Sequence, residues 1–305
     1  MIIALLMKDL AGATGKEEFA HRCFQMMAGT STGGLIALML GRLQIPANEV
    51  LENYSYLSQR LFDSRYKSIR SLYKGCKYSS ATAKRIFENI VNERCPSGSR
   101  ELLNEDDMNS CSVFVTAIDA GNTAGGPLIM RSYGKQTSYT VLEAAEATTA
   151  APSYFTPKTL STGEIVIDGG VRYNNPSEIL LEEARKKFGR YVRFKLFLSI
   201  GTGEKSPLVM RCYRDARAFT SLPRFMSKIM TDSEPAHQRM YTRFEESDLG
   251  TYFRINAPAI GDVSLDDYRS IPAMLRATES FMSTPHMLGV RKEITALLME
   301  NYPCI

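Results

Sequence analysis

The chain has 305 residues, of which 44% are hydrophobic and 23% are charged. A chain of this size and composition can bury a substantial core, which excludes a protein that is disordered throughout. Its net charge is only +4, which excludes the strongly basic surface of a typical nucleic-acid-binding protein. We therefore expect one large folded domain or two modest ones, with no nucleic-acid partner.

Neither a leader peptide nor a membrane span is predicted. The apolar run 1–7 has no basic residue before it, and no apolar run is long enough to cross a bilayer. The six cysteines include no pair at C-x-x-C spacing, and the three histidines are scattered, so we expect no metal and no cofactor. Together these features predict a cytoplasmic protein with reduced thiols.

Helix and strand patterns alternate along the chain, which is typical of an α/β domain. Leu5, Leu6 and Leu10 share one face of an opening helix that ends near Gly12 or Gly15. The predicted helices are 1–11, 33–40, 46–62, 81–92, 141–149 and 177–187, followed by two or three longer helices after residue 205. The predicted strands are 24–27, 111–118, 127–133, 164–168, 193–200 and 252–255.

A glycine-rich turn, G-T-S-T-G-G, lies between the first predicted strand and the helix that follows it. Gly29, Ser31 and Gly33 match G-x-S-x-G, the nucleophile elbow that presents a serine hydroxyl at a sharp strand-to-helix turn. Glycines on both sides let neighbouring segments approach closely, and the helix N-terminus faces a forming oxyanion. The Thr32 N–H is then the natural first oxyanion donor. The alternative is an ordinary glycine-rich turn. A Walker phosphate loop does not fit, because the Gly-Lys-[Ser/Thr] ending of that motif is absent here.

A serine nucleophile needs a base, and Asp168 is the strongest candidate. It ends an apolar strand and precedes Gly169 and Gly170, at the kind of strand end where sites gather in open α/β sheets. Desolvation there would raise the pKa of the carboxyl group and make it more basic. Two alternatives stay open: a turn-capping role for Asp168, and a Ser-Asp-His arrangement that uses His237 or His286.

Two further stretches accompany these motifs, A-T-T-A-A-P-S-Y-F at 147–155 and L-S-I-G-T-G at 198–203. With the elbow and the D-G-G triplet, the set resembles the patatin-like phospholipase family over residues 1–205. The resemblance implies a three-layer α/β/α hydrolase with a central, mostly parallel sheet. It divides the chain into an acyl hydrolase core, 1–205, and a helical part, 206–305, packed on the same domain.

The resemblance also implies a phospholipase A-type serine esterase of lipid metabolism, with a phospholipid or another acyl lipid as substrate. Such an enzyme works by a Ser-Asp dyad without a catalytic histidine: Ser31 attacks the acyl ester and Asp168 takes its proton. The residues that the family motifs assign to the elbow, the oxyanion hole and the support of the aspartate are Gly29, Thr32, Gly33, Gly34, Gly169 and Gly170.

One departure from the family pattern affects the expected activity. Members carry a strand and a glycine-rich oxyanion loop before the first helix, and this sequence begins with what resembles that helix. Half of the oxyanion hole is then unaccounted for, and the loss of one donor costs about 10²–10³ in rate. We expect weakened activity, either from an incomplete gene product or from an inactive relative that binds a lipid or a partner.

A basic segment, 65–85, contains seven lysines and arginines, interleaved tyrosines and no acidic residue. This composition suits the anionic headgroups of a lipid surface, which would give the protein peripheral contact with membranes. A solvated loop is the plain alternative, and single-stranded nucleic acid is recognised by similar chemistry. The serine elbow favours lipid. The candidate membrane patch consists of Lys67, Arg70, Lys74 and Lys77.

Overall fold

The computed structural model describes residues 1–17, 19–63, 76–104, 111–135, 139–204, 233–258, 263–264 and 266–300. The helices in these residues are α1 (Ile2–Thr14), α2 (Ala20–Cys23), α3 (Thr32–Ala37), α4 (Ala47–Phe62), α6 (Ser80–Arg94), α7 (Val141–Thr148), α8 (Ser177–Phe188), α10 (Glu234–Ser247), α11 (Ile271–Met282) and α12 (Pro285–Met299). The strands are β1 (Met26–Thr30), β2 (Ser112–Asp119), β3 (Leu128–Arg131), β4 (Lys158–Thr159), β5 (Ile165–Asp168), β6 (Phe194–Ile200) and β7 (Gly250–Ile255).

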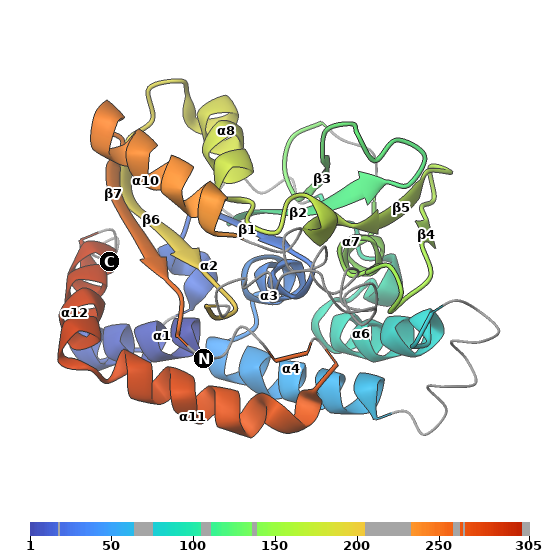
Figure 1. Ribbon diagram of the computed structural model, residues 1–305, viewed down its shortest axis with the longest axis horizontal. Helices are drawn as coiled ribbons and strands as arrows, with labels where there is room; N and C mark the ends of the chain where they lie inside the picture. Colours follow the sequence, from blue (N-terminus) through green and yellow to red (C-terminus); the bar gives the residue numbers. More distant parts are fainter. Residues whose placement is uncertain are drawn as a thin grey trace, which may run out of the picture.

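The strands form a middle layer with helices on both sides, which confirms the predicted three-layer α/β/α class (Figure 1). Helices α8 and α10 lie on one side of the strands, while α3, α4, α6 and α11 lie on the other. Helix α3 packs directly on β1 and β2, and α7 packs on β2. The fold thus places the start of α3 against the centre of the sheet.

Strand pairing is more mixed than the mostly parallel sheet that the sequence predicted. The pairs β1–β2 and β6–β7 are parallel, whereas β2–β3, β2–β5 and β4–β5 are antiparallel. For β2–β3 and β4–β5 the physical reason is connection length, because a parallel crossover needs a dozen or more residues. Only residues 120–127 join β2 to β3, and only 160–164 join β4 to β5.

The helices follow the predicted ranges closely where the sequence carries a strong local signal. The Ser79 hydroxyl accepts the Thr82 N–H at 3.2 Å and starts α6 one residue before the predicted range. Thr140 and Glu143 form a reciprocal capping box at the start of α7. Gly15 ends α1 in the left-handed conformation, with φ at 71°.

The predicted helix 33–40 is corrected by the structure in its second half. After α3 the chain continues as a π-helical turn, Leu38–Arg42, in which the Leu43 N–H donates to the Leu38 carbonyl at 2.8 Å. A Cβ atom at Gly41 would lie 2.5 Å from Cγ2 of Val113 on β2. The close approach of this turn to the strand is therefore possible only with glycine, a constraint that comes from packing.

The part of the chain after residue 205 contributes β7, α10, α11 and α12 to the described structure. Strand β7 pairs with β6, and α12 packs against α1. The division into a core at 1–205 and a helical part at 206–305 stays a prediction.

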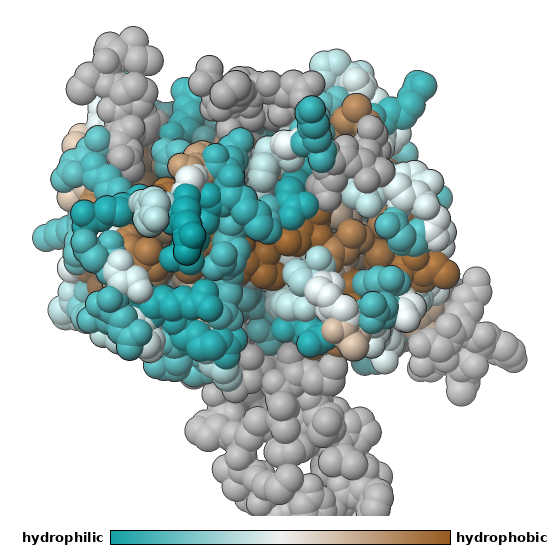
Figure 2. Space-filling model, turned by 90° about the horizontal axis from the view of Figure 1, so that it is seen from above, coloured by the Kyte–Doolittle hydropathy of each residue, from teal (hydrophilic) through white to brown (hydrophobic). Residues whose placement is uncertain are grey.

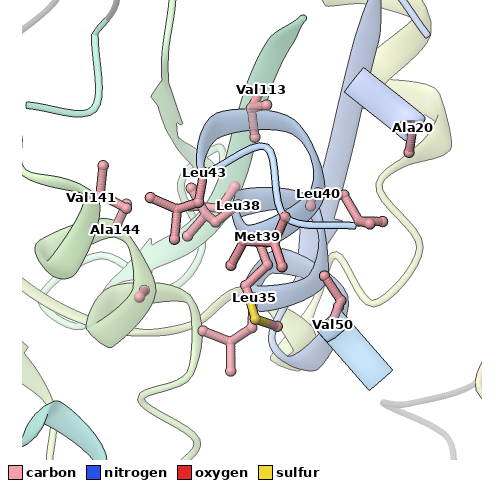
Figure 3. Packing of buried hydrophobic residues seen from close by; sticks show 14 of the residues in the cluster. Ala20, Leu35, Leu38, Met39, Leu40, Leu43, Val50, Val113, Val141 and Ala144 are labelled. Carbon is pink, nitrogen blue, oxygen red and sulfur yellow. The ribbon is translucent and has the colours of Figure 1, made fainter. Parts of the chain in front are cut away.

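The core packs behind α3. Leu38 and Leu43 point toward Val141 and Ala144 on α7, and Leu35 lies on the same side of the turn (Figure 3). Leu38 is fully buried. The first turns after the serine are therefore fixed to the sheet and to α7 by apolar contacts.

The outer surface shows a broken band of hydrophobic residues between hydrophilic margins when the molecule is seen from above (Figure 2). In the described part of the chain, no helix has both the length and the hydropathy that crossing a bilayer requires.

We predict that Leu38→Ala lowers the free energy of unfolding by about 2–5 kcal/mol, because it removes a fully buried side chain and leaves a cavity. Leu288→Ala is the matched control, since that leucine is 42% exposed and its loss should cost less than about 1 kcal/mol. Chemical denaturation of both variants measures the difference. Equal losses would show that the packing behind α3 is not as the structure has it.

Candidate active site

Ser31 lies at the turn between β1 and α3, as the G-x-S-x-G pattern predicts. Its backbone has φ at 56° and ψ at −126°, a conformation that L residues rarely adopt. Such a conformation costs about 1–3 kcal/mol and persists only where the surroundings enforce it. The next residue, Thr32, opens α3, so the unpaired N–H groups of the first helical turn lie beside the serine.

Two glycines make this sharp turn sterically possible. A Cβ atom at Gly29 would lie 2.0 Å from the carbonyl oxygen of Gly33, and one at Gly34 would lie 2.8 Å from the Thr148 side chain. Gly33 itself differs from the prediction, because a Cβ atom there would meet nothing within 4 Å. The close approach expected on both sides of the serine is therefore provided at Gly29 and Gly34.

Ser31 and Asp168 are brought together by one edge of β2. Strand β1 ends at Thr30, which pairs with Thr116, and β5 ends at Asp168, which pairs with the next residue, Ala117. Strand β3 pairs with both Thr116 and Ala117, so β1 and β5 must share the opposite edge. Because β1 runs parallel and β5 antiparallel to β2, their C-terminal ends meet head to head.

Asp168 is a buried carboxyl group, 4% exposed. Burial raises its pKa to about 6, from an ordinary value of 3.8. The nearby Ser31 side chain and the Gly170 N–H, which donates to Oδ1 at 2.7 Å, oppose that rise in pKa. The expected desolvation of this aspartate is thus present, and the Ser31 side chain lies close enough to the carboxyl group to lower its pKa.

The D-G-G glycines have separate roles beside the aspartate. A Cβ atom at Gly169 would lie 2.7 Å from the Thr116 carbonyl oxygen, so only glycine fits where the chain leaves β5. Gly170 supplies the N–H that holds the Asp168 carboxylate. Both positions therefore support Asp168, one by allowing close approach and the other by donating a hydrogen bond.

Three buried threonines around the elbow were not singled out from the sequence. The Thr30 and Thr116 hydroxyls are 2.7 Å apart, and the Thr30 hydroxyl also donates to the Tyr173 carbonyl at 2.7 Å. The Thr148 hydroxyl accepts the Ser31 N–H at 2.9 Å. Thr148 lies in the A-T-T-A-A-P stretch of the motif set, so the sequence indicated that this segment belongs to the site. It did not indicate which contact Thr148 makes.

The L-S-I-G-T-G stretch ties β6 to its neighbours. The Ser199 hydroxyl lies 3.1 Å from the Ser177 hydroxyl at the start of α8 and accepts a hydrogen bond from Arg254 on β7 at 2.9 Å. The Gly203 N–H donates to the side chain of Asn256 at 2.8 Å. The stretch thus links β6 with α8 and β7.

The histidines are engaged elsewhere. His237 Nδ1 lies 3.0 Å from the Tyr252 hydroxyl, the His21 ring packs against Phe19, and His286 is exposed on α12. In the part of the chain that the structure describes, no histidine hydrogen-bonds to Ser31 or Asp168. The geometry offers no support for the Ser-Asp-His alternative.

The candidate membrane patch lies largely outside the described residues. Lys67, Arg70 and Lys74 are not among them. The ammonium group of Lys77 lies 4.5 Å from the centre of the Tyr154 ring, and the Lys77 N–H donates to the Ser153 carbonyl. The membrane patch therefore stays a prediction. Among the described side chains, no group of three or more His, Cys, Asp or Glu residues could hold a metal ion.

Comparison with known proteins identifies the family to which this site belongs. The model of the family described as patatin-like phospholipase matches residues 10–181, more than half of the chain, and the match contains both Ser31 and Asp168. The chain belongs to the patatin-like phospholipase family. The resemblance that was drawn from its motifs is thereby confirmed.

Several curated relatives carry names of the same kind. The chain is 27% identical over 268 residues to calcium-independent phospholipase A2-gamma of Homo sapiens, covering 82% of this chain and 32% of that protein. It is 24% identical over 315 residues to patatin-like phospholipase 1 of Plasmodium falciparum, covering 92% of this chain and 44% of that protein. The chain thus spans from 32% to 44% of the length of these two relatives.

We predict that Gly29→Ala lowers the unfolding temperature markedly, because the added Cβ would overlap the backbone carbonyl of Gly33. Gly33→Ala is the matched control, and its free energy of unfolding should stay within about 0.5 kcal/mol of the parent, since that Cβ enters open space. Thermal unfolding of both variants measures this. Similar losses in the two would contradict the geometry of the elbow.

A second prediction concerns pH. The folded chain keeps a proton on Asp168 up to about pH 6, whereas the unfolded chain loses it near pH 4. The folded state therefore binds more protons in this window, and the free energy of unfolding falls as pH rises from 4 to 6. Asp168→Asn removes the cost of the buried negative charge. It should raise the free energy of unfolding by up to about 3 kcal/mol at pH 7.5, but little at pH 4.

The control for this pH effect is Asp119→Asn, at the exposed end of β2. Denaturation at both pH values should show no comparable change with pH for Asp119→Asn. A stability difference between parent and Asp168→Asn that is equal at pH 4 and pH 7.5 would contradict the raised pKa.

Proposed function

We propose that the chain is a phospholipase A-type lipid acyl hydrolase in which Ser31 is the nucleophile and Asp168 is the base. The observation that carries the proposal is that Ser31 and Asp168 meet at one edge of β2, where Asp168 is a buried carboxyl group with a raised pKa. A nucleophile within hydrogen-bond reach of a base is the arrangement that covalent hydrolysis requires.

In the first step, Ser31 Oγ attacks the carbonyl carbon of the acyl ester while Asp168 takes the hydroxyl proton. The tetrahedral intermediate collapses, the ester bond breaks, and the leaving alcohol takes the proton from Asp168. In the second step, water attacks the acyl-enzyme and gives its proton to Asp168. The bond between the acyl group and Ser31 Oγ then breaks, Ser31 takes the proton back from Asp168, and the fatty acid is released.

The pKa of Asp168 suits both halves of this cycle. At pH 7 a group with a pKa of about 6 is mostly ionised and can accept a proton, yet it is far more basic than an ordinary aspartate. Burial causes this shift, so the low exposure of the carboxyl group before substrate binds is part of the proposed mechanism.

The oxyanion of the intermediate needs donors, and the start of α3 supplies the nearest ones. The Thr32 N–H begins the helix directly after Ser31, where helical N–H groups have no partner within the helix. We assign Thr32 N–H as the first donor of the oxyanion hole.

The substrate class follows from the family and from the names of the relatives, which are phospholipases. We therefore place a phospholipid in the site, with no metal or cofactor taking part. Phospholipids reside in bilayers, so the proposal includes peripheral contact of a cytoplasmic protein with a membrane surface.

The test is reaction with a fluorophosphonate probe together with release of fatty acid from phosphatidylcholine vesicles. The parent should react, and Ser31→Ala should lose both signals. Ser283→Ala, which removes an exposed hydroxyl from the end of α11, should keep both. Asp168→Asn should lower kcat by about 10²–10⁴, the usual contribution of a general base.

The pH dependence gives a further readout of the same proposal. Because Asp168 must be ionised to accept the proton, kcat/KM should be level above pH 6 and should fall below it. Labelling that persists in Ser31→Ala would overturn the nucleophile assignment. Vesicle binding without probe reaction or hydrolysis in the parent would instead indicate a relative that binds lipid without turnover.

A further inference from the structure

Thr148, the last residue of α7, holds the backbone of the nucleophile through its side chain. Resting on the proposed function of Ser31, we propose that Thr148 is a positioning residue for catalysis. Its hydroxyl keeps the elbow in its strained conformation without touching the substrate.

The Thr148 hydroxyl has a fixed orientation. It donates its only proton to the Thr116 carbonyl of β2 at 2.9 Å, so its lone pairs are left to accept. One of them accepts the Ser31 N–H, also at 2.9 Å. Because Thr148 is fully buried, water cannot replace the hydroxyl in either hydrogen bond. The side chain therefore connects the central strand to the nucleophile backbone.

The hydrogen bond acts on the residue whose backbone most needs support. Ser31 is held at φ 56° and ψ −126°. Such a conformation survives only when its surroundings determine it, and an N–H bond to a fixed acceptor is one such determinant. The Thr148 side chain also packs against the first turn of α3, where a Cβ atom at Gly34 would lie 2.8 Å away. The elbow is thus supported from one side by a single residue.

The same segment also contacts the other half of the proposed dyad. Two residues after Thr148, the Ala150 carbonyl accepts the Asp168 N–H at 3.0 Å. The end of α7 therefore holds the Ser31 backbone through a side chain and the Asp168 backbone through a carbonyl. Changes at Thr148 should alter the distance between nucleophile and base, on which proton transfer depends.

The sharpest experiment compares three variants with the parent. Thr148→Val keeps the shape and removes the hydroxyl, while Thr148→Ser keeps the hydroxyl and removes the methyl group. Thr149→Val is the matched control, since among the described residues that hydroxyl bonds only to carbonyls of the helix it follows, with the shorter bond, 2.7 Å, to Ala145. Each protein is measured for its rate of labelling by a fluorophosphonate, for kcat and KM, and for thermal unfolding.

Thr148→Val should lower the labelling rate and kcat by at least about tenfold with little change in KM, because misplacing the reacting group affects the chemical step. Thr148→Ser should restore both to within about threefold of the parent, since the hydroxyl again supplies the acceptor. Thr149→Val should match the parent. A role confined to stability would lower the unfolding temperature of Thr148→Val without changing its kcat.

Hydrogen exchange of the Ser31 amide separates this inference from the proposed function. The amide should be protected in the parent, in Thr148→Ser and in Thr149→Val, and should exchange faster in Thr148→Val, because its acceptor is gone. Unchanged exchange and unchanged kcat in Thr148→Val would overturn the positioning role. A parent that neither labels nor hydrolyses would count against the proposed function, and amide exchange would still decide whether Thr148 holds the elbow.

Discussion

The site depends on one edge of β2, along which two strands arrive from opposite directions. Thr30 of β1 and Asp168 of β5 pair with consecutive residues of that edge, Thr116 and Ala117. The residue after β1 and the last residue of β5 therefore have to meet. The register of the β1–β2 and β2–β5 pairs fixes this contact, which therefore does not depend on the conformation of a loop. Register is strongly specified in a strand that is buried on both faces, as β2 is.

Both groups at this meeting point are held in states that cost stability. Ser31 has a strained backbone, and Asp168 is a carboxyl group placed where its charged form is disfavoured. The surroundings offset these costs with specific hydrogen bonds, from Gly170 to the carboxylate and from Ser31 to Thr148. Stability is given up at both groups, as is common at functional sites.

The apolar packing beneath the site holds the groups that form these hydrogen bonds in place. Helix α3 lies on β1 and β2, and the π-helical turn that follows carries Leu38 toward α7. Thr148 ends α7, so the helix that packs beside α3 also supplies the acceptor for the Ser31 N–H. A shift of α7 would be transmitted to the elbow because close-packed interiors do not deform continuously.

Local sequence signals determined the elements and the two candidate site residues. G-x-S-x-G and D-G-G pointed to Ser31 and Asp168, the Ser79 cap marked α6, and the buried strand at 111–118 was recognised from its uncharged, β-branched residues. Tertiary structure alone decided that β1 and β5 share an edge of β2, that Thr148 joins Ser31 to Thr116, and that Gly33 has open space while Gly34 does not. The reason is range: caps, turns and periodicity act between near neighbours, whereas these contacts join residues 32 to 137 positions apart or depend on what packs opposite.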